Sequence, residues 1–238
     1  MLILAIDSAT PVAGVALMDD GRLIKEEFSN YKKTHSETLM LMVDRVLNES
    51  ERTLDQVDAL AVTTGPGSFT GLRIGLAAVK GLSMAAGIPV AGVSTLDTLA
   101  HNIWAGDALV CPLLDARKQE VYCGFYDVAG KLPLPLLEAR ACAPEEFLAD
   151  AVEVAAKYGK NRIILLGDGY YPYTEFFAEK LGQQLLIPPP HLMLPRASAL
   201  GDLGADKLAK GQVEDIMQLR PSYIRLSEAE YRLGKGEL

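Results

Sequence analysis

The stretch Thr63-Thr64-Gly65-Pro66-Gly67-Ser68-Phe69-Thr70-Gly71-Leu72-Arg73-Ile74-Gly75 decides how the fold of this chain is interpreted. It follows the apolar run 59–62, which predicts a buried strand, and leads into the nearly uncharged run 72–86, which predicts a helix. A glycine-rich turn between a strand and a helix leaves backbone N–H groups free to bind an anion. A tight turn capped by Ser68 or Thr70 explains the same residues equally well. The spacing matches neither a Walker A loop nor a Gly-x-Gly-x-x-Gly fingerprint, so neither nucleotide-binding mechanism is assigned.

The sequence on both sides of this stretch predicts an alternation of strands and helices. In the first part, strands are expected at 2–6, 12–18, 22–29, 59–62 and 88–93, and helices at 34–48, 72–86 and 94–104. Near Gly106 the pattern begins again, with strands at 108–114, 120–128, 134–142, 162–166 and 185–187, and helices at 144–158, 172–181 and 197–210.

The order strand-strand-strand-helix-strand-helix thus occurs twice, although the two halves share no visible sequence identity. This order predicts an α/β fold of two similar lobes with a cleft between them. We expect residues 1–106 to form an N-terminal lobe and residues 107–238 to form a C-terminal lobe with a flexible tail.

Composition limits the classes of function. The chain has 238 residues, a net charge of −8 and 49% hydrophobic residues, which is enough for substantial cores. An acidic surface repels phosphate backbones, so binding of nucleic acid by this chain alone is not expected. No apolar run reaches the roughly 18 residues that span a bilayer, and the cysteines fit buried free thiols. We therefore expect a cytoplasmic protein.

Two apolar helices carry the physical argument for a partner. Residues 34–48 begin with a capping box at Thr34 and are apolar over more than one stripe, and residues 72–86 repeat small residues every four positions at Ala77, Gly81 and Ala85. We expect the pair to meet the same helices of another molecule, although burial inside the subunit is the alternative. The predicted interface consists of His35, Leu39, Met42, Val43, Val46, Leu72, Gly75, Leu76, Val79 and Leu82.

Three segments together give a family resemblance. Residues 3–10, 65–75 and 115–122 closely resemble the TsaB (YeaZ) family of the bacterial machinery for threonylcarbamoyladenosine in tRNA. The resemblance implies the two-lobed actin/Hsp70/sugar-kinase (ASKHA) fold. It also implies a non-catalytic relative of TsaD, the enzyme that transfers the threonylcarbamoyl group to adenosine 37 of tRNAs reading codons that start with A. TsaD and the ATPase TsaE are then the partners, with a homodimer when the chain is alone.

The cleft residues weaken the case for an independent enzyme. Actin-like ATPases carry an Asp-x-Gly-Thr loop after the first strand, whereas this chain has the Asp7–Thr10 loop with Ala9 in the glycine position. Asp7, Ser8, Thr10, Gly67 and Ser68 remain candidates for contact with a nucleotide or an anion. ATP or ADP is expected only in the complex, and tRNA binding only through it.

No catalytic or metal-ligating residue is assigned. The position four residues after His35 is Leu39, His101 and His191 are isolated, and the cysteines have no neighbouring histidine. Asp115, Arg117, Glu120 and Asp168 are further cleft candidates, for which a solvated turn or a local ion pair is the alternative. An ATP-dependent phosphotransferase or a metal-independent peptidase that acts alone is the alternative function.

Overall fold

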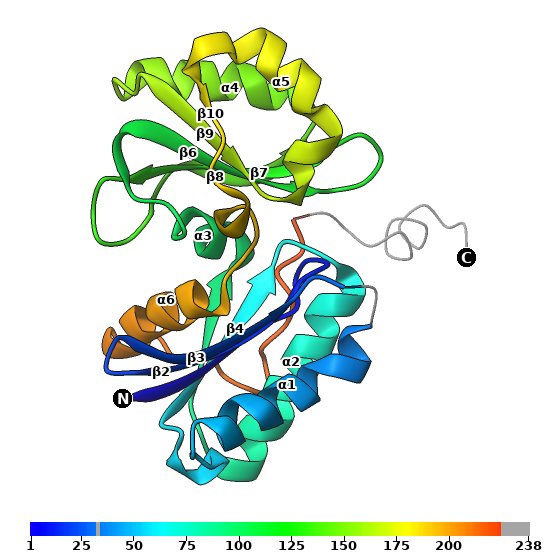
Figure 1. Ribbon diagram of the computed structural model, residues 1–238, viewed down its shortest axis with the longest axis vertical. Helices are drawn as coiled ribbons and strands as arrows, with labels where there is room; N and C mark the ends of the chain where they lie inside the picture. The colour runs from blue at the N-terminus through cyan, green and yellow to red at the C-terminus, as the bar shows by residue number, and fades with distance from the viewer. Residues whose placement is uncertain (32–33, 225–238) are drawn as a thin grey trace.

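Two α/β lobes, each built on a five-stranded sheet, make up the protein (Figure 1). The computed structural model describes residues 1–31 and 34–224. The first sheet has the order β3-β2-β1-β4-β5 and consists of β1 (Leu2–Asp7), β2 (Ala13–Asp19), β3 (Arg22–Ser29), β4 (Ala59–Gly65) and β5 (Val90–Ser94). The first part of the chain also forms α1 (His35–Glu49), the 3₁₀ turn η1 (Leu54–Gln56), α2 (Phe69–Ala86) and α3 (Thr95–Ala100).

The second sheet has the order β10-β9-β6-β7-β8. Its strands are β6 (Ala105–Asp115), β7 (Val121–Val128), β8 (Leu134–Cys142), β9 (Arg162–Leu166) and β10 (Leu185–Leu186). The accompanying helices are α4 (Pro144–Lys157), η2 (Asp168–Tyr173), α5 (Thr174–Leu181), η3 (Gly182–Gln184), η4 (Pro190–Leu192) and α6 (Ala197–Ala209). The strands predicted at 134–142 and 162–166 are confirmed without a change of boundary, whereas α3 ends at Ala100 instead of continuing to 104.

Local sequence explains why the elements of the first lobe form where they do. β1 is buried along its whole length because it lies between β2, its antiparallel partner, and β4, its parallel partner. The predicted capping box at Thr34 begins α1, with Glu37 Oε2 accepting a hydrogen bond from the Thr34 N–H at 3.2 Å. Gly87 ends α2 in the left-handed region, at φ 68°.

Helices cover both faces of the first sheet (Figure 1). α1 and α2 pack on one face, in a core that includes Leu4, Val46 and Val79. α6 packs on the other face, where Leu200 lies in a cluster with Ile3. The expectation that residues 107–238 all belong to the C-terminal lobe is therefore wrong for α6. This helix returns to the first sheet and buries its apolar side there.

The stretch after α6 also lies with the first lobe. The Glu214 N–H donates to the Val90 carbonyl at 2.8 Å, and the Ser222 N–H donates to the Thr64 carbonyl at 2.7 Å. Leu219 belongs to the core under α1 and α2, whereas Ile224 contacts the core of the second lobe. Residues 212–224 therefore form a C-terminal strap that reaches both lobes, and most of the predicted flexible tail, 225–238, lies outside the described residues.

Among the residues that the structure describes, no helix combines the length and the apolar character that a membrane crossing requires.

Candidate functional site

A cleft of about 370 Å³ lies between the two lobes. The first lobe contributes the loop after β1, the start of α1 and the turn before α2, and the second lobe contributes the ends of β6 and β9 and the start of β7. Its lining residues are Ala9, Thr10, Pro11, His35, Gly67, Ser68, Phe69, Thr70, Leu114, Asp115, Ala116, Arg117, Tyr122 and Asp168. The structure thus brings the candidates Thr10, Gly67 and Ser68 together, and it adds His35, which was predicted at the partner interface.

Asp7 and Ser8 lie behind the wall of this cleft and do not line it. The Asp7 carboxyl is fully buried, and its Oδ1 accepts hydrogen bonds from Thr63 Oγ1 at 2.6 Å and from the Ala9 N–H at 3.0 Å. Burial raises the pKa of Asp7 above its ordinary value, although these two hydrogen bonds lower it in part. The contact of Asp7 with a nucleotide or an anion stays a prediction, although its carboxyl does not line the cleft and is already bonded to Thr63 and Ala9.

Ser8 serves the contact between the loop and α2. Its Oγ donates to the Gly71 carbonyl at 2.9 Å, and it occupies the space that a Cβ on Gly75 would need, 2.4 Å from that position. The contact of Ser8 with an anion likewise stays a prediction, although its hydroxyl is turned toward Gly71 inside the lobe. Gly75, predicted at a partner interface, instead permits this close internal contact.

The turn before α2 is both a helix cap and a cleft wall. Ser68 Oγ accepts from the Gly71 N–H at 3.2 Å, which confirms the predicted cap. A Cβ on Gly67 would lie 2.1 Å from the Ala9 carbonyl oxygen, so only glycine fits. His35 Nε2 lies 2.8 Å from the Thr10 carbonyl, which can only accept, so Nε2 carries the proton. A second hollow of about 680 Å³ adjoins the cleft at His35 and reaches Tyr31.

The opposite wall holds charges that are bonded to one another. Arg117 pairs with Asp115 Oδ2 at 2.9 Å, and Asp115 Oδ1 also accepts from the Arg117 N–H. Asp168 Oδ1 accepts from the Asp115 N–H at 3.2 Å, and burial raises the pKa of Asp168. Residues 117–119 are in the left-handed region, which the sequence did not indicate because none is glycine. This geometry favours a local ion pair in a strained turn over a catalytic dyad.

The predicted helix interface requires the largest correction. The side chains predicted to meet a partner are mostly buried within this chain, in the core between the helices and the first sheet. The buried members are Leu39, Met42, Val43, Val46, Leu72, Gly75, Leu76 and Val79, whereas His35 and Leu82 are half-buried. These residues form the inward-facing apolar stripe of each amphipathic helix, because they pack against the apolar strands of the first sheet.

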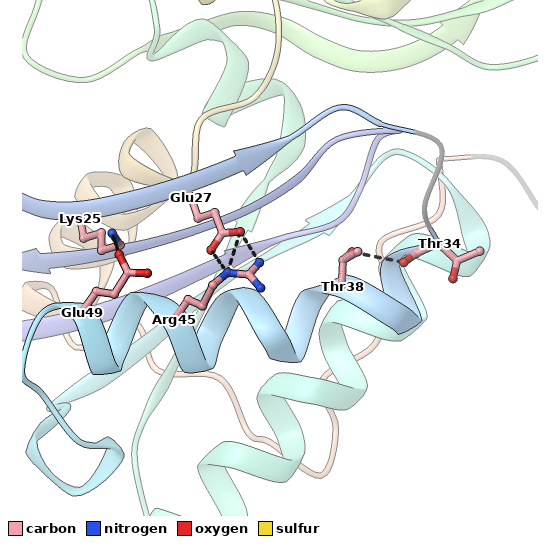
Figure 2. A network of polar contacts seen from close by, with 6 residues as sticks. All are labelled: Lys25, Glu27, Thr34, Thr38, Arg45 and Glu49. Carbon is pink, nitrogen blue, oxygen red and sulfur yellow. Dashed lines mark hydrogen bonds and ion pairs between the residues drawn. The ribbon is translucent and has the colours of Figure 1, made fainter.

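Polar contacts hold α1 in this orientation (Figure 2). Figure 2 shows Lys25 and Glu27 of β3 directed toward Glu49 and Arg45 of α1. Arg45 Nε donates to Glu27 Oε2 at 2.9 Å, and Lys25 pairs with Glu49. Both ion pairs are solvent-accessible, so each adds little to the stability of the fold. Their role is to fix which side of α1 faces β3.

The outward sides of α1 and α2 carry a different set of apolar groups. Met40 and Leu41 on α1 are 47% and 57% exposed, and Met84 on α2 is 67% exposed. The small-residue row Ala77, Gly81 and Ala85 is also exposed. A Cβ on Gly81 would meet no atom within 4 Å, so this glycine has no internal contact to explain it. We call Met40, Leu41, Ala77, Gly81, Met84 and Ala85 the outer helix face.

A groove of about 530 Å³ borders this face, between α2 and the C-terminal strap. Leu76 and Ile216 contribute apolar atoms, whereas Arg73, Lys80 and Arg220 contribute positive charge. The local sequence pattern gives no sign of this groove, because its two walls lie far apart in the chain.

Residues 22–233 match the family described as TsaD: tRNA N6-adenosine threonylcarbamoyltransferase. The tRNA threonylcarbamoyladenosine biosynthesis protein TsaB of Bacillus subtilis is 35% identical over 97% of this chain and 96% of its own length. This chain belongs to the TsaB (YeaZ) family.

Solved structures agree with membership of the TsaB family. YeaZ from Pseudomonas aeruginosa has a TM-score of 0.78 at 30% identity, covering 93% of this chain and 99% of that one. The activator of 2-hydroxyisocaproyl-CoA dehydratase from Clostridium difficile has a TM-score of 0.51 at 10% identity, covering 89% of this chain and 97% of that one, so it shows the fold alone. The α/β, actin-like two-lobed fold expected from the TsaB resemblance is confirmed.

Proposed function

We propose that this chain is a non-catalytic subunit in the threonylcarbamoylation of adenosine 37 in tRNAs that read codons starting with A. It contacts a TsaD-type transferase through the outer helix face and supports that enzyme together with TsaE. tRNA and ATP or ADP bind in the complex and not to this chain alone. The observation that carries this proposal is the exposed row of Ala77, Gly81 and Ala85 beside Met84.

A glycine in the middle of a helix needs a reason. Glycine in a helix lowers stability by about 0.5–1 kcal/mol relative to alanine. No close internal packing explains the glycine at position 81, because open space surrounds its Cβ position. Small residues four positions apart allow another helix to approach the backbone closely. The exposed Met84, one helical turn after Gly81 on α2, adapts its shape to the partner surface beside that contact.

The same face gives the isolated chain a route to a homodimer. A surface that accepts a related helix pair from the transferase also accepts its own copy about a two-fold axis, because both offer similar helices. The homodimer and the heterodimer then compete for one face, and their ratio follows the concentrations of the two proteins.

The cleft supports a role without chemistry of its own. Asp7 is buried behind the wall, the Asp115 carboxylate pairs with Arg117, and the Asp168 carboxylate accepts a hydrogen bond from the Asp115 N–H. Carboxylates committed in this way are poorly placed to act as a general base or to hold a metal-bound phosphate. Activity then depends on what this chain does to its partner, which is a coupling between binding sites.

The variant Gly81→Leu tests the proposal. We expect it to fold, because its side chain enters open space, and to lower tRNA threonylcarbamoylation at least tenfold in a mixture reconstituted with TsaD and TsaE. Nucleoside mass spectrometry measures the product, and urea denaturation measures the fold.

Gly106→Leu is the matched control, since Gly106 also has open space around its Cβ position but lies on β6 in the other lobe. Normal modification by Gly81→Leu would contradict the proposed contact face. Turnover of ATP or of a peptide by the purified chain alone would instead support a cleft enzyme.

A further inference from the structure

Three cysteines lie on neighbouring strands in the core of the second lobe. Cys111 is on β6, Cys123 on β7 and Cys142 at the end of β8. The Sγ atoms of Cys123 and Cys142 are 3.6 Å apart. Cys123 is opposite Arg140 in the β7–β8 ladder and Cys142 is opposite Val121, so the two thiols are diagonal neighbours.

We propose that Cys123 and Cys142 form a redox site, at which a peroxide converts the two thiols into a reversible disulfide within the subunit. The proposal is independent of the partner role of the outer helix face, which lies on the other lobe. It assigns a modification to groups that the threonylcarbamoylation role leaves unused.

The surroundings of the two sulfurs give them different roles. Cys142 is the last residue of β8 and keeps 4% of its surface exposed, whereas Cys123 is fully buried. The hydrogen-bond contact with Cys123, in which either sulfur can donate, and the charge of Arg140 lower the pKa of Cys142, whereas the same contact raises the pKa of Cys123. Cys142 is therefore the nucleophile and Cys123 the resolving thiol.

The reaction is balanced with hydrogen peroxide as the oxidant. The Cys142 thiolate attacks one peroxide oxygen, the O–O bond breaks, and the departing hydroxide takes a proton to become water. The Cys123 sulfur then attacks the sulfur of the Cys142 sulfenic acid, loses its own proton, and displaces a second water as the S–S bond forms. Two thiols and one peroxide give one disulfide and two waters.

The position of β8 allows the sulfurs to close this gap. A disulfide requires an S–S distance of about 2.05 Å, so the strands must approach or slide slightly. Within the described part of the chain, β8 is an edge strand that pairs only with β7, and the ladder shifts register between Cys123 and Phe125. An edge strand with one partner adjusts with fewer broken contacts than a central one. Cys111 is on the central strand β6, where burial raises the pKa of its thiol.

The test uses the full chain, treated with hydrogen peroxide, then denatured and alkylated with iodoacetamide. We expect alkylated cysteines to fall from three to one, and peptide mapping to show Cys123 joined to Cys142 with Cys111 alkylated. Dithiothreitol should restore all three thiols. Retention of three alkylated thiols, a disulfide that includes Cys111, or a link between two chains would each overturn the proposal.

Serine variants separate the two roles. Cys123→Ser should accumulate a sulfenic acid at Cys142 that reacts with dimedone, whereas Cys142→Ser should show no label at Cys123. Cys111→Ser is the matched control, and its disulfide should form at the wild-type rate. If a serine variant does not fold, the peptide map of the wild-type chain still decides the outcome. Equal dimedone labelling of both single variants would contradict the assigned roles.

Discussion

Single residues in this protein take roles that depend on the side of the loop on which they lie. Asp7 ends β1, where ligand-facing groups are common in α/β folds, yet its carboxyl is turned inward and bonded to Thr63. Ser8 is likewise turned toward Gly71, whereas Thr10 lines the cleft. The same loop therefore divides its polar groups between the core and the cleft.

At this scale we predict the effect of Asp7→Asn on stability. Burial raises the pKa of Asp7 above 3.8, so between that value and the folded-state pKa the folded chain holds more protons than the unfolded chain. The contribution of Asp7 to the free energy of unfolding therefore falls as pH rises through this range. Asparagine keeps a neutral group, so the variant should gain stability relative to wild type with rising pH.

Urea denaturation of both proteins at several pH values between about 4 and 8 measures this difference. Thr10→Val is a suitable control, because that side chain lies on the same loop and does not titrate. A variant that loses stability relative to wild type as pH rises would indicate an ionised carboxylate and contradict the assignment.

At the scale of elements, each helix is defined by the sheet that it covers. α1 and α2 bury one stripe on the first sheet and leave the outer helix face exposed, which is why the predicted interface was assigned to the wrong side. α6 covers the opposite face of the same sheet, at close range. Cβ atoms on Gly201 and Gly204 would lie 2.7 Å from Met18 Cγ and 2.6 Å from Ala61 Cβ.

We predict that Gly204→Val lowers the free energy of unfolding by about 1–3 kcal/mol, because its side chain would be forced against Ala61 in a closely packed interface. Gly81→Val, in open space on α2, is the matched control and should change stability by less than about 0.5 kcal/mol. Urea denaturation at constant temperature measures both. Equal stability of the two variants would show that α6 does not pack closely on the sheet.

At the scale of the molecule, the chain crosses between the lobes more than once. It leaves the first lobe through α3, returns at α6, and reaches the second core again at Ile224. The C-terminal strap is held near the cleft by Tyr223, whose ring centroid lies 4.5 Å from that of Phe69. Arg73 Nε also donates to the Tyr223 hydroxyl at 3.1 Å.

We predict that Tyr223→Ala releases the strap without unfolding either lobe. The lost aromatic contact is worth about 0.5–1.5 kcal/mol beyond the buried area, which is small beside the cores of the two lobes. Hydrogen exchange should become faster in peptides covering 214–224, while β1 and β7 keep their protection. Tyr158→Ala, at the surface end of α4, is the control and should leave the exchange of residues 214–224 unchanged. Unchanged exchange in Tyr223→Ala as well would show that other contacts hold the strap, and would contradict the prediction.

Much of the fold could be predicted from the sequence, because local physics specifies the elements. The capping box at Thr34, the cap at Ser68 and the uninterrupted apolar run of β1 each act within a few residues, and the structure confirms them. The repeated element order likewise indicated two lobes. Family membership followed from short segments whose residues can be read without any knowledge of their contacts.

The sequence by itself therefore determined the elements, their order, the two-lobed class and the family. Only the tertiary structure decided which stripe of α1 and α2 is covered, that α6 returns to the first sheet, that Asp7 is buried, and that Cys123 approaches Cys142. The physical reason is distance along the chain. A helix cap or the spacing of apolar residues depends on neighbours in sequence. Which side of a helix is buried depends on surfaces that meet only after the chain has folded.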